Sequence, residues 1–176
     1  MGQTKSRHYA GIKWGLQNPS AIIVGEYQPR PKDELILVQE FYRQGVLLPE
    51  MAAAAKEMAE KYGVRKFFCD PNEPRFIERL RKERLWAVAV KDEELAGINL
   101  ISERLQNTRE GKPGQLVISR ECKNLIFEFQ RYHAQERDPN KPYRDKPVAV
   151  HNYALDALRF MVLGLHYEAT PRVRWL

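Results

Sequence analysis

Three short apolar segments stand close together in the first 43 residues, and they constrain the fold more than any other feature of the sequence. They are residues 8–13 (HYAGIK), 20–27 (SAIIVGEY) and 34–43 (ELILVQEFYR), separated by polar stretches that contain Gly, Asn or Pro. Segments of this length and composition are typical of β-strands, and such short connections join neighbouring antiparallel strands. The sequence therefore predicts a three-stranded antiparallel meander at the start of the chain.

Beyond residue 43 the pattern changes to alternating helices and strands. The clearest helix is 49–63, because Pro49 begins an alanine-rich segment that ends at Gly63. The apolar spacing predicts further strands at 65–70, 86–90 and 115–119, and further helices at 73–84, 97–107, 120–132 and 151–167. This order predicts an α/β fold in which a central mixed sheet, with three antiparallel strands and then parallel strands, is flanked by helices.

The length of 176 residues suits one domain with a substantial core. We expect this domain to cover residues 1–167 and to be followed by a loosely held tail, 168–176. The polar, Pro-rich stretch 133–147 is expected to be a loop or a mobile hairpin. Residues 108–114 (TREGKPG) contain Gly-Lys without the phosphate-loop spacing, so we expect no ATPase site.

Charge and cysteine content narrow the classes of function. Lys and Arg number 29 against 23 Asp and Glu, a moderate excess that suits a nucleic-acid partner but is also common in proteins without one. Two cysteines, Cys69 and Cys122, are too few for a zinc module or a disulfide framework, and Cys69 lies in an apolar segment that suits the core. No segment is apolar over the length of a membrane span, so we expect a cytoplasmic protein with no membrane partner.

Polar residues from three places in the sequence could meet in one site. Lys13 ends the first strand, Asp70 ends the fourth strand, and Asn152 and Asp156 lie one turn apart at the start of the last helix. If the first and fourth strands are neighbours, all of these residues reach the same edge of the sheet. Ligands bind at such strand ends in α/β folds.

Each of these residues also has a purely structural interpretation. Asp70 is followed by proline, and aspartate is a favoured turn residue in that position. Asp156 could pair with Arg159 on a solvated helix face. His151 and Asn152 could simply cap the last helix, because asparagine is a favoured N-cap residue.

The segments that carry these residues resemble a known family. GIKWGLQNPSAIIV (11–24), FFCDPNEPRFIERL (67–80) and YALDALRF (153–160) occur in an order that resembles the nuclease domain of the large terminase subunit of tailed bacteriophages. The resemblance covers nearly the whole chain. It implies a ribonuclease H-like fold related to RuvC-type resolvases, and a metal-dependent endonuclease that cuts concatemeric double-stranded DNA during genome packaging.

The resemblance also implies partners and a location. The full subunit of the family carries an ATPase domain upstream, which this sequence lacks, and it works with a small terminase and a portal. A protein of this kind acts in the host cytoplasm and is not part of the mature virion.

A two-metal site is a further implication of the resemblance. In the family, carboxylates at the first strand, the central strand and the start of the last helix hold two Mg²⁺ or Mn²⁺ ions about 3.5–4 Å apart. In this chain only Asp70 keeps a metal-ligating carboxylate. Lys13 occupies the first-strand position, and His151 and Asn152 occupy the helix-start positions. Asp156 matches a second acidic position one turn further on.

These departures change the expected chemistry of the site. An ammonium group at Lys13 repels a divalent cation and attracts Asp70, whereas Asn152 keeps an oxygen but loses the charge. We therefore expect the catalytic activity of this chain to be reduced or absent.

Basic residues in the stretch before the last helix are the best candidates for DNA contact. They are Arg137, Lys141, Arg144 and Lys146. The basic residues of helix 73–84 alternate with glutamates, which is more typical of a solvated helix. Two alternatives stay open: a RuvC-like resolvase, which would need acids that this chain lacks, and a non-catalytic DNA-binding or motor-docking module.

Overall fold

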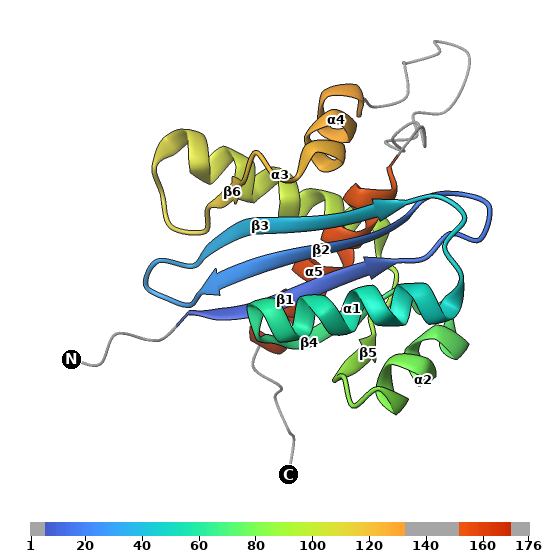
Figure 1. Cartoon of the computed structure of the whole chain (residues 1–176). Coiled ribbons are helices and arrows are strands. Elements are labelled where there is room, and N and C mark those ends of the chain that lie inside the picture. Colours follow the sequence, from blue (N-terminus) through green and yellow to red (C-terminus); the bar gives the residue numbers. More distant parts are fainter. Residues whose placement is uncertain (1–5, 133–151, 170–176) are drawn as a thin grey trace.

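A computed structural model of the protein describes residues 6–132 and 152–169, which form a sheet covered by helices on both faces (Figure 1). The described strands form one sheet in the order β5-β4-β1-β2-β3-β6. Their bounds are β1 Arg7–Lys13, β2 Ser20–Gln28, β3 Glu34–Arg43, β4 Val64–Cys69, β5 Ala87–Ala89 and β6 Leu116–Ile118. Strands β1, β2 and β3 pair antiparallel, which confirms the predicted meander.

The remaining strands are all parallel to their neighbours. Strand β4 pairs with β1, β5 with β4, and β6 with β3. The expected α/β fold with a central mixed sheet is therefore confirmed, and so is the condition that the first and fourth strands are neighbours. Because β1 and β4 are parallel, their carboxyl ends lie at the same edge of the sheet.

Two layers of helices cover the sheet (Figure 1). Helices α1 (Leu48–Tyr62) and α2 (Pro74–Lys82) lie on one face, and α3 (Glu94–Glu110), α4 (Lys123–Arg131) and α5 (Tyr153–Ala169) lie on the other. All five were predicted, but α3 begins three residues before the predicted 97 and ends three after 107. No helix in the described ranges is long and apolar enough to cross a membrane.

The alternation of side chains along the strands divides the core in two. Tyr9 and Phe68 point to the face covered by α3, α4 and α5, whereas Ala10, Ile12 and Cys69 point to the face covered by α1 and α2. Cys69 is thus a buried core residue, as its apolar surroundings in the sequence indicated.

Helix α5 lies directly against β1. A Cβ atom built on Gly11 would come within 1.8 Å of the carbonyl oxygen of Ala157, so only glycine allows this approach of helix and strand. The contact fixes the position of α5 on the sheet and brings the first turn of the helix close to the carboxyl ends of β1 and β4.

Candidate functional site

The ends of β1 and β4 place Lys13 and Asp70 side by side on the face that α5 covers. Ile12 pairs with Cys69 across the two strands, and both point to the opposite face. The next residue of each strand therefore points toward α5, because side chains alternate along a strand. The ammonium group of Lys13 lies 6.0 Å from the centre of the Phe160 ring, which belongs to α5.

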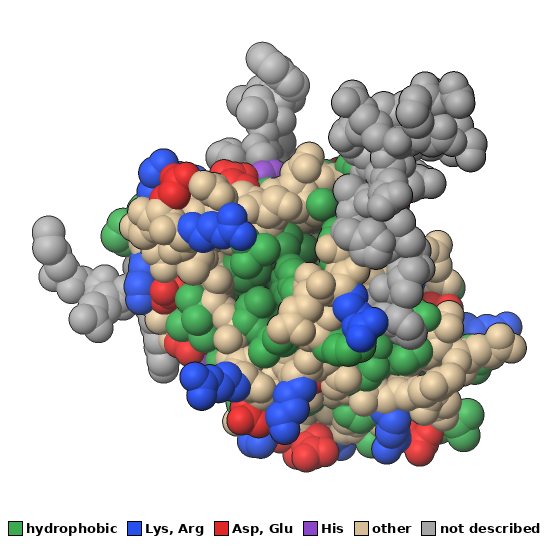
Figure 2. Space-filling model, turned by 90° about the horizontal axis from the view of Figure 1, so that it is seen from above, with side chains coloured by type: hydrophobic (Ala, Val, Ile, Leu, Met, Phe, Trp, Pro, Cys, Tyr) green, Lys and Arg blue, Asp and Glu red, His purple; other side chains and the backbone are tan. Residues whose placement is uncertain are grey.

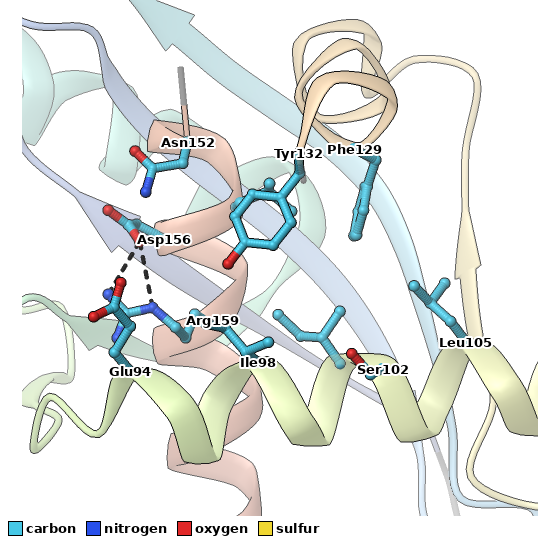
Figure 3. A pocket seen from close by; sticks show the side chains of 11 residues that line it. Glu94, Ile98, Ser102, Leu105, Phe129, Tyr132, Asn152, Asp156 and Arg159 are labelled. Atoms are coloured by element: carbon cyan, nitrogen blue, oxygen red, sulfur yellow. Dashed lines mark hydrogen bonds and ion pairs between the residues drawn. The ribbon is translucent and has the colours of Figure 1, made fainter. Parts of the chain in front are cut away.

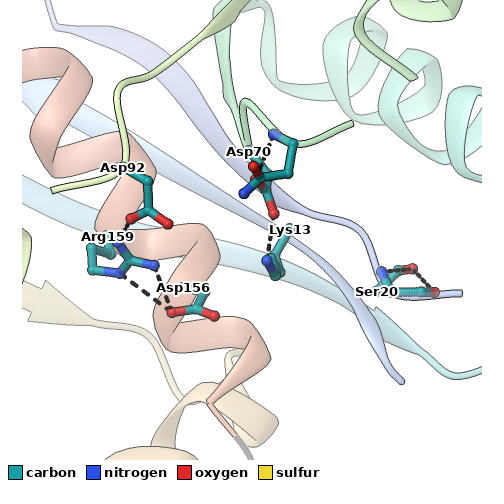
Figure 4. Close-up of polar contacts among 8 residues, drawn as sticks. Lys13, Ser20, Asp70, Asp92, Asp156 and Arg159 are labelled. Atoms are coloured by element: carbon teal, nitrogen blue, oxygen red, sulfur yellow. Dashed lines mark hydrogen bonds and ion pairs between the residues drawn. The ribbon is translucent and has the colours of Figure 1, made fainter. Parts of the chain in front are cut away.

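Lys13 and Asp70 form an ion pair (Figure 4). The ammonium group donates to Oδ2 of Asp70, as the predicted attraction between the two charges requires. Oδ1 of Asp70 accepts from the backbone N–H of Asn72 at 3.0 Å and from its side-chain amide at 3.1 Å. Both oxygens of this carboxylate, which is only 4% exposed, are thus engaged by protein groups.

The turn that follows Lys13 is held by Ser20 at the start of β2 (Figure 4). The Ser20 hydroxyl accepts from the backbone N–H of Gly15 at 3.1 Å and donates to the carbonyl oxygen of Gly15 at 3.1 Å. Because Ser20 is fully buried, these bonds fix the path of the chain directly after Lys13.

Asp156 belongs to a second ionic group on the first turns of α5 (Figure 4). Its Oδ1 accepts from Nη2 of Arg159 at 3.0 Å and from Nε at 3.3 Å, and Arg159 also pairs with Asp92, which follows β5. The predicted Asp156–Arg159 pair is confirmed, but the predicted solvated face is wrong, because Arg159 is only 6% exposed. Burial raises the pKa of Asp156, while the nearby charges of Arg159 and Lys13 lower it.

Asn152 lies half-buried at the start of α5, and its carbonyl oxygen accepts from the backbone N–H of Asp156 at 2.8 Å. The structure thus brings Lys13 and Asp70 together, and it places Asp156 on the adjacent helix and Asn152 directly before it. The other expected site residues, His151, Arg137, Lys141, Arg144 and Lys146, lie outside the described residues.

A cavity of about 230 Å³ opens beside these residues, between α3, α4 and the start of α5 (Figure 3). The rings of Phe129 and Tyr132 and the side chain of Ile98 form its apolar walls, and Asp156 and Arg159 lie at one end. The sequence predicted an apolar stripe on α3 but gave no sign that part of it lines a cavity rather than core.

Glu128 is a residue that the sequence analysis missed. It is buried on α4, where it accepts from the hydroxyl of Tyr42 at 2.9 Å and from the backbone N–H of Leu155 at 2.9 Å. Burial raises the pKa of Glu128 to about 7, although the bonds from the backbone of Leu155 and Ala154 lower it. The one signal in the sequence is an acidic residue inside the apolar segment LIFEF (125–129).

The described residues do not fit a two-metal site. Within the described residues, no group of three His, Cys, Asp or Glu side chains is arranged to hold a metal ion. Asp70 already accepts from Lys13 and Asn72, and Asp156 is paired with Arg159. A divalent cation needs several free anionic oxygens. At the end of β1 this site instead presents the ammonium group of Lys13.

Comparison with families and curated proteins identifies no relative, because no family model and no curated protein matches the chain. Solved structures do match. The large terminase from a thermophilic bacteriophage superimposes with a TM-score of 0.76 at 21% identity, covering 92% of this chain and 41% of that one. This chain therefore spans about two fifths of the length of that terminase.

Two isolated nuclease domains match over most of their own length. The P22 large terminase nuclease domain gives a TM-score of 0.71 at 17% identity, covering 92% of this chain and 82% of that one. The nuclease domain of g2p, the large terminase of bacteriophage SPP1, solved with bound Mn, gives 0.64 at 20% identity, covering 88% and 84%. At these identities the likeness establishes the fold: the chain has the fold of terminase nuclease domains, as the sequence resemblance implied.

Proposed function

We propose that this chain is the nuclease-fold domain of the large terminase subunit of a tailed bacteriophage, in which DNA hydrolysis is impaired by Lys13. In this proposal the domain binds the double-stranded DNA that is packaged, in the host cytoplasm and alongside an ATPase domain, a small terminase and a portal. The observation that carries the proposal is the ion pair between Lys13 and Asp70 at the strand ends of a terminase nuclease fold.

The match with isolated nuclease domains supports the assignment to this part of a terminase. It extends over 82% of the P22 domain and 84% of the SPP1 domain, so it includes far more than one shared motif. The SPP1 domain was solved with bound Mn. A nuclease domain of this fold that binds a divalent metal is therefore the reference with which the residues of this chain are compared.

The charges at the strand ends support the impairment. At about 4 Å and an effective dielectric constant near 20, an ammonium and a carboxylate attract each other by about 4 kcal/mol before desolvation. A divalent cation would have to displace Lys13 from Asp70 and then remain beside a positive charge. Asn152 adds no negative charge that would compensate. We therefore expect weak binding of Mg²⁺ or Mn²⁺ and little hydrolysis.

A plasmid-nicking assay with Mn²⁺ or Mg²⁺ tests the proposal. We expect little cleavage by the chain with its own sequence, and more cleavage by the double variant Lys13→Asp/Asn152→Asp, in which two carboxylates return to the site. A matched control adds Asp70→Asn to the double variant and should return cleavage to background, which excludes a contaminating nuclease. Efficient cleavage by the unaltered chain would contradict the impairment.

A non-catalytic DNA-binding or motor-docking module is the second candidate function. It is favoured by the lack of a metal-ligand cluster among the described residues. The nicking assay together with a measurement of Mn²⁺ and DNA binding separates the two: a variant Lys13→Asp/Asn152→Asp that binds both but does not cleave would favour this candidate. A RuvC-like resolvase would instead bind branched DNA in preference to a linear duplex, which a competition experiment measures.

A further inference from the structure

A groove of about 740 Å³ lies between β5 and the last turns of α5. This volume is within the range of about 300–1,000 Å³ that is typical of ligand pockets. The groove is lined by the apolar side chains of Phe68, Val88 and Val90 and by the rings of Trp86 and Tyr167. Because Trp86 is 56% exposed and Tyr167 is 38% exposed, aromatic surface faces solvent here. Such a surface is stabilised when an apolar segment covers it.

The charged side chains at the groove are balanced in sign. They are two lysines and two glutamates, in the pairs Lys66–Glu168 and Lys91–Glu93. The wider surface is also mixed: on the face seen in Figure 2, the described Lys and Arg side chains lie among Asp and Glu side chains, around a central area of hydrophobic side chains. The groove therefore selects its occupant by apolar contact rather than by charge.

The residues that follow α5 have the pattern of an extended segment with one apolar face. The described part of α5 ends at Ala169, and the chain continues as TPRVRWL (170–176). Pro171, Val173 and Trp175 alternate with two arginines. Successive side chains of an extended chain point in opposite directions, so the three apolar side chains share one face. The segment 170–176 can thus cover an apolar surface while its arginines stay solvated.

The groove begins where this segment leaves the helix. Glu168, near the end of α5, lines the groove and pairs with Lys66. The ammonium group of Lys66 lies 3.8 Å from the centre of the Trp86 ring. From Trp86 the groove follows the chain through β5 to Val90, about 13 Å at the rise of a strand. An extended chain of the length of segment 170–176 spans up to about 23 Å, so it covers the groove once it turns back beside α5.

We infer that the segment 170–176 binds in this groove in an extended conformation, with its apolar face toward the protein and its arginines toward solvent. An occupant from the same chain is favoured because its covalent attachment beside the groove gives it a high effective concentration there. Both the groove and its occupant belong to this chain, so the arrangement does not depend on the proposed function.

Occupation of the groove also affects the candidate site. Lys91 and Glu93, which follow β5, line the groove, whereas Asp92 between them pairs with Arg159. Glu93 accepts from the hydroxyl of Tyr167 and so connects this loop to α5. A segment packed against Lys91 and Glu93 restricts the movement of the loop that carries Asp92. The ion pair of Asp92 with Arg159 is then steadier than it is beside an open groove.

Amide hydrogen exchange of the full chain tests the inference. After correction for the intrinsic rate of each sequence, amides of residues 173–176 should exchange about tenfold or more slowly than in the free peptide TPRVRWL, because leaving the groove exposes the apolar face to water. The variant Val173→Ser/Trp175→Ser should lose this protection. It should also speed the exchange of residues 86–93, which the segment then no longer covers.

Matched variants separate this contact from general effects. Arg172→Ser/Arg174→Ser alters the opposite face of the same segment and should keep both regions protected. On the groove side, Trp86→Ser should release the segment, whereas Phe127→Ser, at an aromatic residue of α4 that is 46% exposed, should not. Thermal unfolding of each variant verifies that it is folded.

Each outcome supports or overturns the inference. Protection that is lost in Val173→Ser/Trp175→Ser and in Trp86→Ser, is kept in both controls and is independent of protein concentration supports it. Exchange of residues 173–176 at the rate of the free peptide overturns it, and so does exchange of residues 86–93 that the double variant leaves unchanged. Protection that grows with protein concentration, with a dimer in light scattering, overturns it in favour of a second copy. The proposed function is tested separately by plasmid nicking and stands or falls independently.

Discussion

At the scale of single residues, the sequence was most informative where a residue departs from an otherwise matching motif. Lys13 stands in GIKWG, and its positive charge predicted the attraction to Asp70 that the structure contains. The second contact of Asp70, with Asn72, follows from local turn chemistry and could also be expected from the sequence. The ion pair that buries Arg159 could not be expected, because its partner Asp92 is 67 residues away in sequence.

The ion pair of Lys13 and Asp70 leads to a prediction for stability. Lys13→Met leaves a carboxylate that is 4% exposed without its cation, so the free energy of unfolding should fall by about 2 kcal/mol. Adding Asp70→Asn removes the unpaired charge and should recover more than half of this loss. Urea unfolding of both single variants and the double variant measures the coupling, and strictly additive effects would contradict it.

Glu128 leads to a prediction for pH dependence. Its pKa of about 7 lies above the ordinary value of 4.5, so the folded state binds this proton more tightly than the unfolded state does. The stabilisation from the bound proton is complete below about pH 4.5 and is lost as the pH rises through 7. As the pH rises from 5 to 8, the free energy of unfolding of Glu128→Gln should therefore increase relative to that of the unaltered chain by on the order of 2 kcal/mol.

Chemical unfolding at several pH values measures this difference. Taking the difference between the two proteins removes the contribution of titrating groups that do not interact with Glu128. Asp156 is not one of these groups, because its charge raises the pKa of Glu128. Glu60→Gln on the exposed face of α1 is the matched control for the loss of a carboxyl group as such. A constant difference for Glu128→Gln would mean that its carboxyl group titrates normally in the folded protein.

At the scale of elements, strands and helices were predicted well in their centres and less well at their ends. Apolar spacing identified α3 from Ile98, Ile101 and Leu105, but the helix extends to Glu94 and Glu110, and neither extension adds a residue to that apolar stripe. The cavity beside α5 was not predictable either. It depends on how three helices pack against one another, which hydrophobic periodicity within each helix does not encode.

The contact between β1 and α5 leads to a prediction for packing. Gly11→Ala should lower the free energy of unfolding by about 3 kcal/mol, because the new methyl group meets the backbone carbonyl of Ala157, which is unable to rotate away. Gly25→Ala is the comparison on the neighbouring strand: there the closest atom, at 2.8 Å, is the flexible end of Leu35. Its cost should be about 1 kcal/mol, and equal costs in thermal or urea unfolding would contradict the assigned cause.

At the scale of the whole molecule, the order of elements was enough to predict a mixed sheet and the antiparallel pairing of its first three strands, whereas the pairing of the first strand with the fourth was only a condition of the argument. A meander followed by alternating helices and strands allows few arrangements, and the parallel pairing of β4 with β1 then brings distant residues to one edge. Predicting the chemistry of that edge required the resemblance to a known family, which indicated the residue types expected there. Motif and topology together therefore indicated one candidate site, at the carboxyl ends of β1 and β4.

The response of the whole fold to divalent metal is the last prediction. Because Lys13 and the paired carboxylates leave no metal-ligand cluster in the described residues, Mn²⁺ or EDTA should change the melting temperature of the unaltered chain by less than about 1 °C. In the double variant Lys13→Asp/Asn152→Asp, bound Mn²⁺ should relieve the repulsion between the neighbouring carboxylates. At a concentration of about 100 times the dissociation constant, Mn²⁺ then adds about 2.7 kcal/mol and raises the melting temperature by about 5 °C or more. Differential scanning calorimetry reads this without reference to catalysis, and equal stabilisation of both proteins by Mn²⁺ would mean that Lys13 does not exclude the metal.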